Sequence, residues 1–253
     1  VYKRQPLKIV IEEPELKLSQ LGKRPQALGK KEADFTIPVF IEKMLLKSGK
    51  VTYETQSLRL HSEGINAVFS QNKNNFTLYS EIKENDLSLK KLERNIRCNL
   101  SLALSGRGRK LTLQRFHVKG PDGIIKAGGT IDDIFNPEME LATSSVIDSS
   151  LAAVLLKIPF DWSGDIKEKG ILIRKDKELS YRGQIASPSI DLNRVYMGNV
   201  NGRVEYNDQE GGHVTMSLRN TAGGHGDISI DFDKNSVRGR VNGISIQPIA
   251  NEI

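Results

Sequence analysis

The sequence predicts an all-β protein whose strands are mainly antiparallel and follow one another as an elongated meander. Apolar and polar residues alternate over most of the chain, with the period of two that is typical of half-buried strands. Short segments rich in Gly, Asn, Asp and Pro separate these runs at hairpin distances. Helical signals are confined to one short stretch, so we expect the sheet to account for nearly all of the fold.

The alternating runs define the expected strands in chain order. They are Leu7–Ile11, Phe76–Ile82, Ile96–Leu104, Leu111–Leu113, Val214–Leu218 and Ile228–Phe232. After Leu113 the alternation slips by one residue. This slip predicts a β-bulge near Gln114 and Arg115.

Two segments could be helical by composition, and we interpret them differently. Phe40–Lys47 is expected to be a strand, because strand-like Val51–Tyr53 follows at hairpin distance, with a turn at Ser48–Gly49. Ser144–Leu156 has Ser and Asp near its start, an Ala-Leu body and a proline beyond its end. It predicts one short helix around residues 145–156.

A loose repeat of strand, Gly-containing turn and strand predicts units that must stack to bury their apolar side chains. The chain starts without Met, and its first residues resemble a translated adaptor. We therefore expect an internal fragment of a longer protein that forms one continuous fold. Its expected parts are a non-native scar at 1–5, first β repeats at 6–143, a short helical insertion at 144–157 and further β repeats at 158–253.

Composition and motif spacing argue against several classes of function. The 37 Lys and Arg against 31 Asp and Glu give a charge of +6, but no basic block is interleaved with aromatics, so nucleic acid is not an expected partner. The single Cys98 excludes an internal disulfide. The four histidines, His61, His117, His213 and His225, lack metal-ligand spacing. We expect no metal, no cofactor and no catalytic residue, and hence a protein that is not an enzyme.

The alternation places apolar residues along one face of the sheet, which one short helix is too small to cover. The sheet could curl into a barrel or gutter, or its apolar face could meet a ligand. The residues expected to line this face are Phe76, Leu78, Ile96, Leu100, Leu102, Leu111, Leu113, Val214, Met216, Ile228, Ile230 and Phe232. The alternative is that the same residues form a closed core.

Several stretches resemble the TamB/AsmA superfamily of bacterial envelope proteins. Gly128–Leu141 (GGTIDDIFNPEMEL) is the most family-like, with a Gly-Thr strand, an acidic turn and an Asn-Pro before the next strand. The others are Leu7–Leu18, Pro38–Tyr53, Ser57–Ile82, Leu151–Ile166, Leu179–Tyr206 and Val214–Asp231. Together they cover most of the chain as degenerate β repeats.

The resemblance implies a curled sheet, often called a β-taco or repeating β-groove, that carries phospholipid acyl chains between inner and outer membranes. It also implies a periplasmic location, a parent protein anchored in the inner membrane of a diderm bacterium, and an outer-membrane β-barrel as a partner of that parent. Acyl chains gain about 0.8 kcal/mol per CH₂ on leaving water, so an apolar groove needs no catalytic residue.

Two other functions remain open at this point. A scaffold for outer-membrane protein assembly would pair a partner strand with an exposed sheet edge. A carbohydrate-active enzyme would need paired carboxylates and aromatic platforms, and the chain has only Trp162 and six scattered Tyr. Lipid transfer would use the apolar face, so Leu102→Asp or Met216→Glu should block it, whereas a proline at an edge should affect strand capture more.

Overall fold

The computed structural model describes sixteen strands and one short helical segment. The described residues are 7–19, 41–55, 58–89, 94–133, 137–151, 162–192, 195–209, 211–219, 224–231, 234 and 236–243. The strands are β1 (Leu7–Glu12), β2 (Glu15–Ser19), β3 (Ile41–Glu54), β4 (Leu58–Asn72), β5 (Asn75–Leu89), β6 (Arg94–Arg107), β7 (Lys110–Gly120), β8 (Gly123–Ile131), β9 (Met139–Asp148), β10 (Trp162–Ser163), β11 (Asp165–Lys175), β12 (Glu178–Leu192), β13 (Val195–Asn207), β14 (Gly211–Arg219), β15 (His225–Asp231) and β16 (Ser236–Asn242). Residues 1–5 and Phe232 lie outside the described residues.

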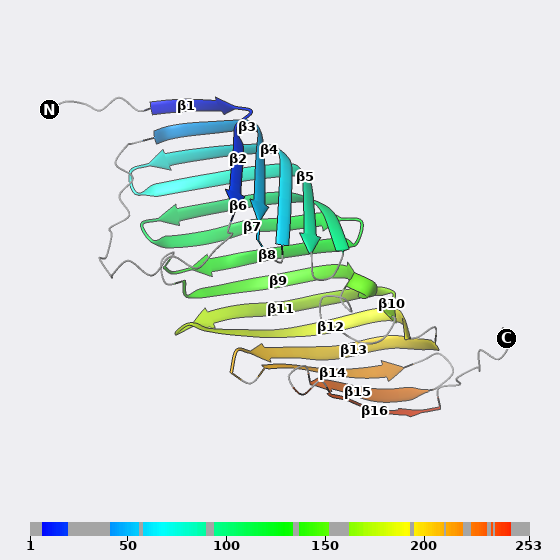
Figure 1. Cartoon of the computed structure of the whole chain (residues 1–253). Coiled ribbons are helices and arrows are strands. Elements are labelled where there is room, and N and C mark those ends of the chain that lie inside the picture. The colour runs from blue at the N-terminus through cyan, green and yellow to red at the C-terminus, as the bar shows by residue number, and fades with distance from the viewer. Residues whose placement is uncertain are drawn as a thin grey trace, which may run out of the picture. The chain divides into compact units, whose positions relative to one another are not determined.

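The strands form an open, mainly antiparallel sheet, so the predicted fold class is confirmed (Figure 1). The order is β1-β3-β4-β5-β6-β7-β8-β9-β11-β12-β13-β14-β15-β16, with β2 on β3 and β10 on β12. Two strands depart from the antiparallel pattern, because β1 and β2 both run parallel to β3. All six predicted alternating runs fall in strands, as far as they are described.

By contact density the chain divides into two units. Unit 1 comprises residues 1–121 and 128–136, and unit 2 comprises 122–127 and 137–253. Strand β8 contributes residues to both. Each unit is described by itself below.

The helix predicted for residues 145–156 begins later than expected. Residues 144–148 belong to β9, and the described helical residues are 149–151, with 152–161 outside the described residues. The reason is tertiary: β9 pairs without interruption with β11, from Met139 opposite Arg174 to Asp148 opposite Asp165. The β-branched Val146 and Ile147 fit this pairing better than a helix.

Strands β3, β4 and β5 of unit 1 each bend midway along their length (Figure 1). Register shifts mark the bend at Gly49 in β3 and between Ile82 and Asn85 in β5, and Gly64 in β4 has a positive φ of 64°. β-Bulges re-aim a strand in this way without ending it. The turn predicted at Ser48–Gly49 is therefore wrong: Gly49 is a bulge inside one continuous β3.

The bulge predicted near Gln114 is confirmed. Ala103 pairs with Arg115 and Leu104 pairs with Leu113, which leaves Gln114 as the extra residue of β7. The bulge keeps the apolar residues on both sides of it on one face of the sheet.

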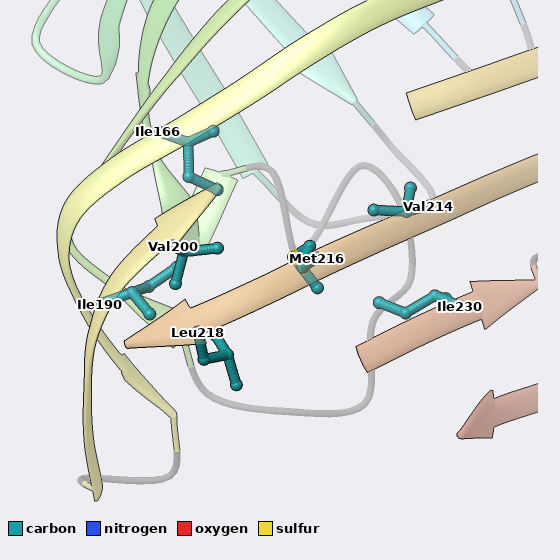
Figure 2. Close-up of a cluster of buried hydrophobic side chains, with 7 residues drawn as sticks. All are labelled: Ile166, Ile190, Val200, Val214, Met216, Leu218 and Ile230. Atoms are coloured by element: carbon teal, nitrogen blue, oxygen red, sulfur yellow. The ribbon is translucent and has the colours of Figure 1, made fainter. Parts of the chain in front are cut away.

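Unit 2 has a closed apolar cluster (Figure 2). Its buried members come from β11 to β15 and are Ile166, Ile190, Val200, Val214, Met216, Leu218 and Ile230. From Gly212 to Arg219 in β14, buried and exposed residues alternate strictly, as the sequence predicted for this strand.

Candidate functional site

One face of unit 1 carries continuous rows of apolar side chains across its strands, and we call it the inner face of unit 1. Residues paired directly across strands point to the same face, so the register defines each row. One row is Met44, Phe69, Leu78, Leu104 and Leu113, the next is Leu46, Ala67, Ser80, Leu102 and Phe116, and a third is Gly49, Ile65, Ile82, Leu100 and Val118.

The seven predicted lining residues of unit 1 all lie on this face, and each is half-buried. They are Phe76, Leu78, Ile96, Leu100, Leu102, Leu111 and Leu113. Within the described residues of unit 1, no Leu, Ile, Val, Phe or Met side chain is fully buried. The inner face of unit 1 is therefore an apolar surface that remains accessible to solvent.

Large side chains pack over Gly106 on this face. A Cβ added at Gly106 would lie 2.3 Å from Cζ of Phe76 and 2.8 Å from Cδ2 of Leu111, so these side chains cover the glycine. The Phe76 ring also stacks on Phe69, with ring centroids 5.9 Å apart. Gly106 thus leaves room for two large side chains from the strands on either side of β6.

Sequence reasoning missed about half of the inner face of unit 1. The missed members include Met44, Leu46, Ile65, Phe69, Ile82, Leu104, Phe116 and Val118. For Ile82 and Leu104, which end predicted alternating runs, and for Phe116 and Val118, which follow the predicted slip, the sequence already carried the signal. In β3 and β4 the bulge at Gly49 breaks the period of two, which hides Met44, Leu46, Ile65 and Phe69.

A buried polar row crosses the inner face of unit 1 near the bend. Ser62 and Asn85, which are 3% and 6% exposed, lie opposite each other, and Ser62 Oγ donates to Asn85 Oδ1 at 2.7 Å. Asn85 Nδ2 in turn donates to the backbone carbonyl of Cys98 at 3.0 Å. Burial raises the pKa of the half-buried Cys98 thiol, which favours its protonated form.

Three of the five predicted lining residues of unit 2 lie in the closed cluster of Figure 2. Val214, Met216 and Ile230 are 4–5% exposed, and Ile228 packs against them with partial burial. Phe232 lies outside the described residues. For unit 2, the arrangement is the closed core that the sequence left open as the alternative.

The same face of unit 2 holds one carboxylate among its apolar rows. Glu168 accepts hydrogen bonds from three hydroxyls: Thr143 Oγ1 at 2.8 Å, Ser145 Oγ at 2.9 Å, and the hydroxyl of Tyr181. Burial and the hydrogen bond to Glu168 raise the pKa of Tyr181 well above its usual range. Glu168 was not among the residues predicted from the sequence, because the run Ile171-Leu172-Ile173 near it obscures which residues face inward.

A hydroxyl, an imidazole and a carboxylate are aligned on the opposite, outer face of unit 1. Thr52 Oγ1 lies 2.9 Å from His61 Nδ1, and His61 Nε2 lies 3.1 Å from Oε1 of Glu63, to which Lys50 Nζ also donates at 3.2 Å. The hydrogen bond from His61, followed by that from Lys50, lowers the pKa of the Glu63 carboxyl. Because both His61 and Glu63 are 40% exposed, this network is a cross-strand interaction in contact with water.

The described recesses open on the outer faces. In unit 1 a recess of about 550 Å³ lies over β3 to β7 beside Val68, Tyr79 and Ala103. In unit 2 a larger trough of about 1170 Å³ crosses β9 to β16 between two rows of outward side chains. Within the described ranges, no group of three or more His, Cys, Asp or Glu could hold a metal ion.

No protein-family model, curated protein or solved structure matches this chain. In the part of the chain that the structure describes, no helix is both long and apolar enough to cross a membrane.

Proposed function

We propose that the inner face of unit 1 binds phospholipid acyl chains and passes them along without chemical change. The observation that carries the proposal is the contrast in burial between two faces with similar sequence patterns. Seven apolar side chains of unit 2 are fully buried in one cluster, whereas those on the inner face of unit 1 are only partly buried over rows that cross five strands. A soluble protein rarely leaves a continuous apolar surface uncovered unless something binds there.

The chemistry of this face suits a hydrocarbon chain better than a polar ligand. The three full rows contain Ser80 as their one polar side chain. Each methylene that moves from water onto such a surface gains about 0.8 kcal/mol, so an acyl chain of lipid length can bind without a charged anchor. A surface without strong anchors also lets the chain slide, which transfer between membranes requires. The periplasmic role and the membrane-to-membrane route are proposed from the family resemblance alone.

Lipid co-purification tests the proposal. The full chain is purified with bacterial phospholipid present and analysed by native mass spectrometry, beside Leu102→Asp on the inner face and Ser101→Asp on the same strand but the outer face. We expect bound phospholipid in the unmodified chain and in Ser101→Asp, and its loss in Leu102→Asp. Equal lipid content in all three proteins would contradict the proposal.

Cys98 supplies a second readout that does not depend on how well the Leu102 variant folds. It is the single cysteine of the chain and lies on the inner face of unit 1, opposite Asn85. Bound decyl or dodecyl chains should slow its alkylation by a maleimide in the unmodified protein. The matched control is a Cys98→Ser, Ser101→Cys protein, whose outward thiol should react at the same rate with and without lipid. Unchanged alkylation of Cys98 at saturating lipid would contradict acyl-chain binding at this face.

A second candidate function is a scaffold that captures a partner strand at the edge formed by β1 and β2. No described strand pairs with the free side of either one, and their Val10, Ile11, Leu16 and Leu18 side chains are 37–54% exposed. An exposed apolar edge is a template for strand addition. Val10→Lys with Leu18→Lys should abolish capture of an outer-membrane protein strand and leave lipid binding intact, whereas the inner-face variant should do the opposite.

A further inference from the structure

The outer face of unit 2 carries five cations in two adjacent cross-strand rows, and we call them the cationic stripe. One row runs Ser144, Lys169, Gln184, Arg203, Thr215, Ser229 and Arg238, and the other runs Val146, Lys167, Ala186, Asn201, Ser217, Asp227 and Arg240. The stripe consists of Lys167, Lys169, Arg203, Arg238 and Arg240, all exposed. Asp227 is the one carboxylate in the two rows.

None of these five cations has an ion-pair partner among the described residues. Some cations of unit 1, such as Lys47 and Lys50, lie within 4.0 Å of a carboxylate, but others, such as Lys83 and Lys119, also have no ion-pair partner among the described residues. The stripe is distinguished by the gathering of five such cations in two adjacent rows. Unpaired cations gathered in one place create a positive potential that neighbouring groups do not cancel. The stripe is therefore available to an anionic partner.

The flanking rows carry mixed charge. On one side Arg182 lies opposite Glu205 and Asp231 pairs with Lys234, and on the other Asp148 faces Asp165 across β9 and β11 while Arg219 stands on β14. Within each of these flanking rows the two carboxylates outnumber the single arginine, whereas cations prevail in the stripe. This arrangement favours a narrow, extended anion that runs across the strands over a broad anionic surface.

The trough of about 1170 Å³ follows the same path. It is lined by both rows, from Ser144 and Val146 on β9 to Arg238 and Arg240 on β16. Between the cations stand neutral hydrogen-bonding side chains: Gln184, Asn201, Thr215, Ser217 and Ser229. No aromatic side chain lines it.

We propose that this trough binds a linear acidic glycan, a chain of sugars of which some carry carboxylate groups. Neighbouring strands lie about 4.8 Å apart, which is close to the length of one sugar unit in an extended glycan. A glycan laid across the strands would place one sugar per strand, with its hydroxyls against the neutral side chains. The cations of β11 and β13 stand two strands apart and those of β13 and β16 three strands apart, so carboxylates spaced along such a chain could each meet a cation.

Two other anionic partners fit less well. Single-stranded nucleic acid gains much of its affinity from bases stacked on aromatic rings, which this trough lacks. An anionic membrane is a broad surface that would extend over the flanking rows, where carboxylates outnumber cations. The proposal is independent of acyl-chain binding, because the trough lies on the outer face of unit 2 and the apolar surface on the inner face of unit 1.

The test measures binding of a fluorescent hyaluronan hexasaccharide, which has a carboxylate on alternate sugars, to the full chain at low salt. We expect binding that weakens as salt rises, and no binding of neutral maltohexaose. Arg203→Gln with Arg238→Gln should weaken binding by about tenfold or more, which corresponds to about 1.4 kcal/mol. The matched control Arg219→Gln removes an exposed outward arginine of β14 outside the stripe and should change affinity less than twofold.

Each of the following results would overturn the proposal and point to a different explanation. Equal losses in the stripe and control variants would mean that net charge alone attracts the glycan. If a thymidine tetranucleotide, which has the same number of charges, bound more tightly than the hexasaccharide, the partner would be nucleic acid. Retention of the protein on phosphatidylglycerol vesicles would instead indicate a membrane surface. Failure of the hexasaccharide to bind would also overturn it. Leu102→Asp should leave glycan binding unchanged, so failure of this proposal and of acyl-chain binding can be told apart.

Discussion

The hydroxyl of Tyr181 reaches across two glycines to donate a hydrogen bond to Glu168. Cβ atoms added at Gly170 and Gly183 would each lie 2.3 Å from that hydroxyl oxygen, so both glycines are covered by the Tyr181 side chain. Gly170 and Gly183 are direct partners in the pairing of β11 with β12, and their missing side chains form the channel through which the ring passes. This explains how the Glu168 carboxylate is held within an otherwise apolar face. The Tyr181 ring covers the glycine backbone, and the Tyr181 hydroxyl donates a hydrogen bond to the carboxylate.

Removing the hydroxyl should therefore destabilise unit 2. In Tyr181→Phe the half-buried Glu168 carboxylate loses one of its three hydroxyl donors, at a cost of about 1–3 kcal/mol in unfolding free energy. Urea unfolding followed by fluorescence of Trp162, the single tryptophan and part of β10 in unit 2, measures this loss. Tyr206→Phe is the control: its hydroxyl donates at 2.9 Å to the exposed Asp208, and its loss should cost less than about 0.5 kcal/mol.

The stability of unit 2 should fall at high pH through the same tyrosine. Burial and the bond to Glu168 raise the pKa of Tyr181, so folding favours its neutral form. A raised tyrosine pKa contributes stability that is complete below the unfolded-state value of about 10 and is lost as pH rises above it. Unfolding free energy measured from pH 8.5 to 11 should thus decline more steeply in the unmodified protein than in Tyr181→Phe. Parallel curves for the two proteins would contradict this linkage.

The alternation in the sequence was sufficient to predict strands and their inward residues wherever the register is unbroken. In β14 the buried positions Val214, Met216 and Leu218 are those that the period of two selects. The slip after Leu113 likewise predicted the extra residue Gln114. Both succeed because the direction in which a side chain points follows from its place in the strand alone.

Other features depend on what lies opposite, which a local pattern does not contain. Ser144–Asp148 looks like a helix start, but pairing with β11 makes it a strand. Alternation also says which side chains share a face and not what covers that face. The same alternation therefore marked both Leu102 of unit 1, which is only partly buried, and Met216 of unit 2, which is fully buried.

The difference in burial between Met216 and Leu102 should appear as a difference in the unfolding free energy that their alanine variants lose. Met216 is 5% exposed and packed in a closed cluster, so Met216→Ala should leave a cavity and cost about 2–5 kcal/mol. Leu102→Ala should cost about 1–2 kcal/mol, because its side chain already meets solvent. Trp162 fluorescence reports the first and urea-dependent alkylation of Cys98 the second. By the same reasoning, Met216→Glu should unfold unit 2 before it affects lipid binding, and similar costs for the two alanine variants would contradict the distinction.

The covering of Gly183 by Tyr181 predicts a substitution whose effect changes sign with its background. In the unmodified protein, Gly183→Ala places a methyl group within 3.0 Å of the Tyr181 hydroxyl oxygen and Cζ, so the ring must shift and its bond to Glu168 weaken. We expect a loss of about 1–3 kcal/mol in unfolding free energy. In a Tyr181→Ala background the space above Gly183 is open, and the alanine should stabilise by about 0.5–1 kcal/mol because glycine is unfavourable within a strand. Urea unfolding of the four proteins of this double-mutant cycle, followed by Trp162 fluorescence, measures the coupling. If Gly183→Ala has the same effect in both backgrounds, the tyrosine does not determine the requirement for glycine at this position.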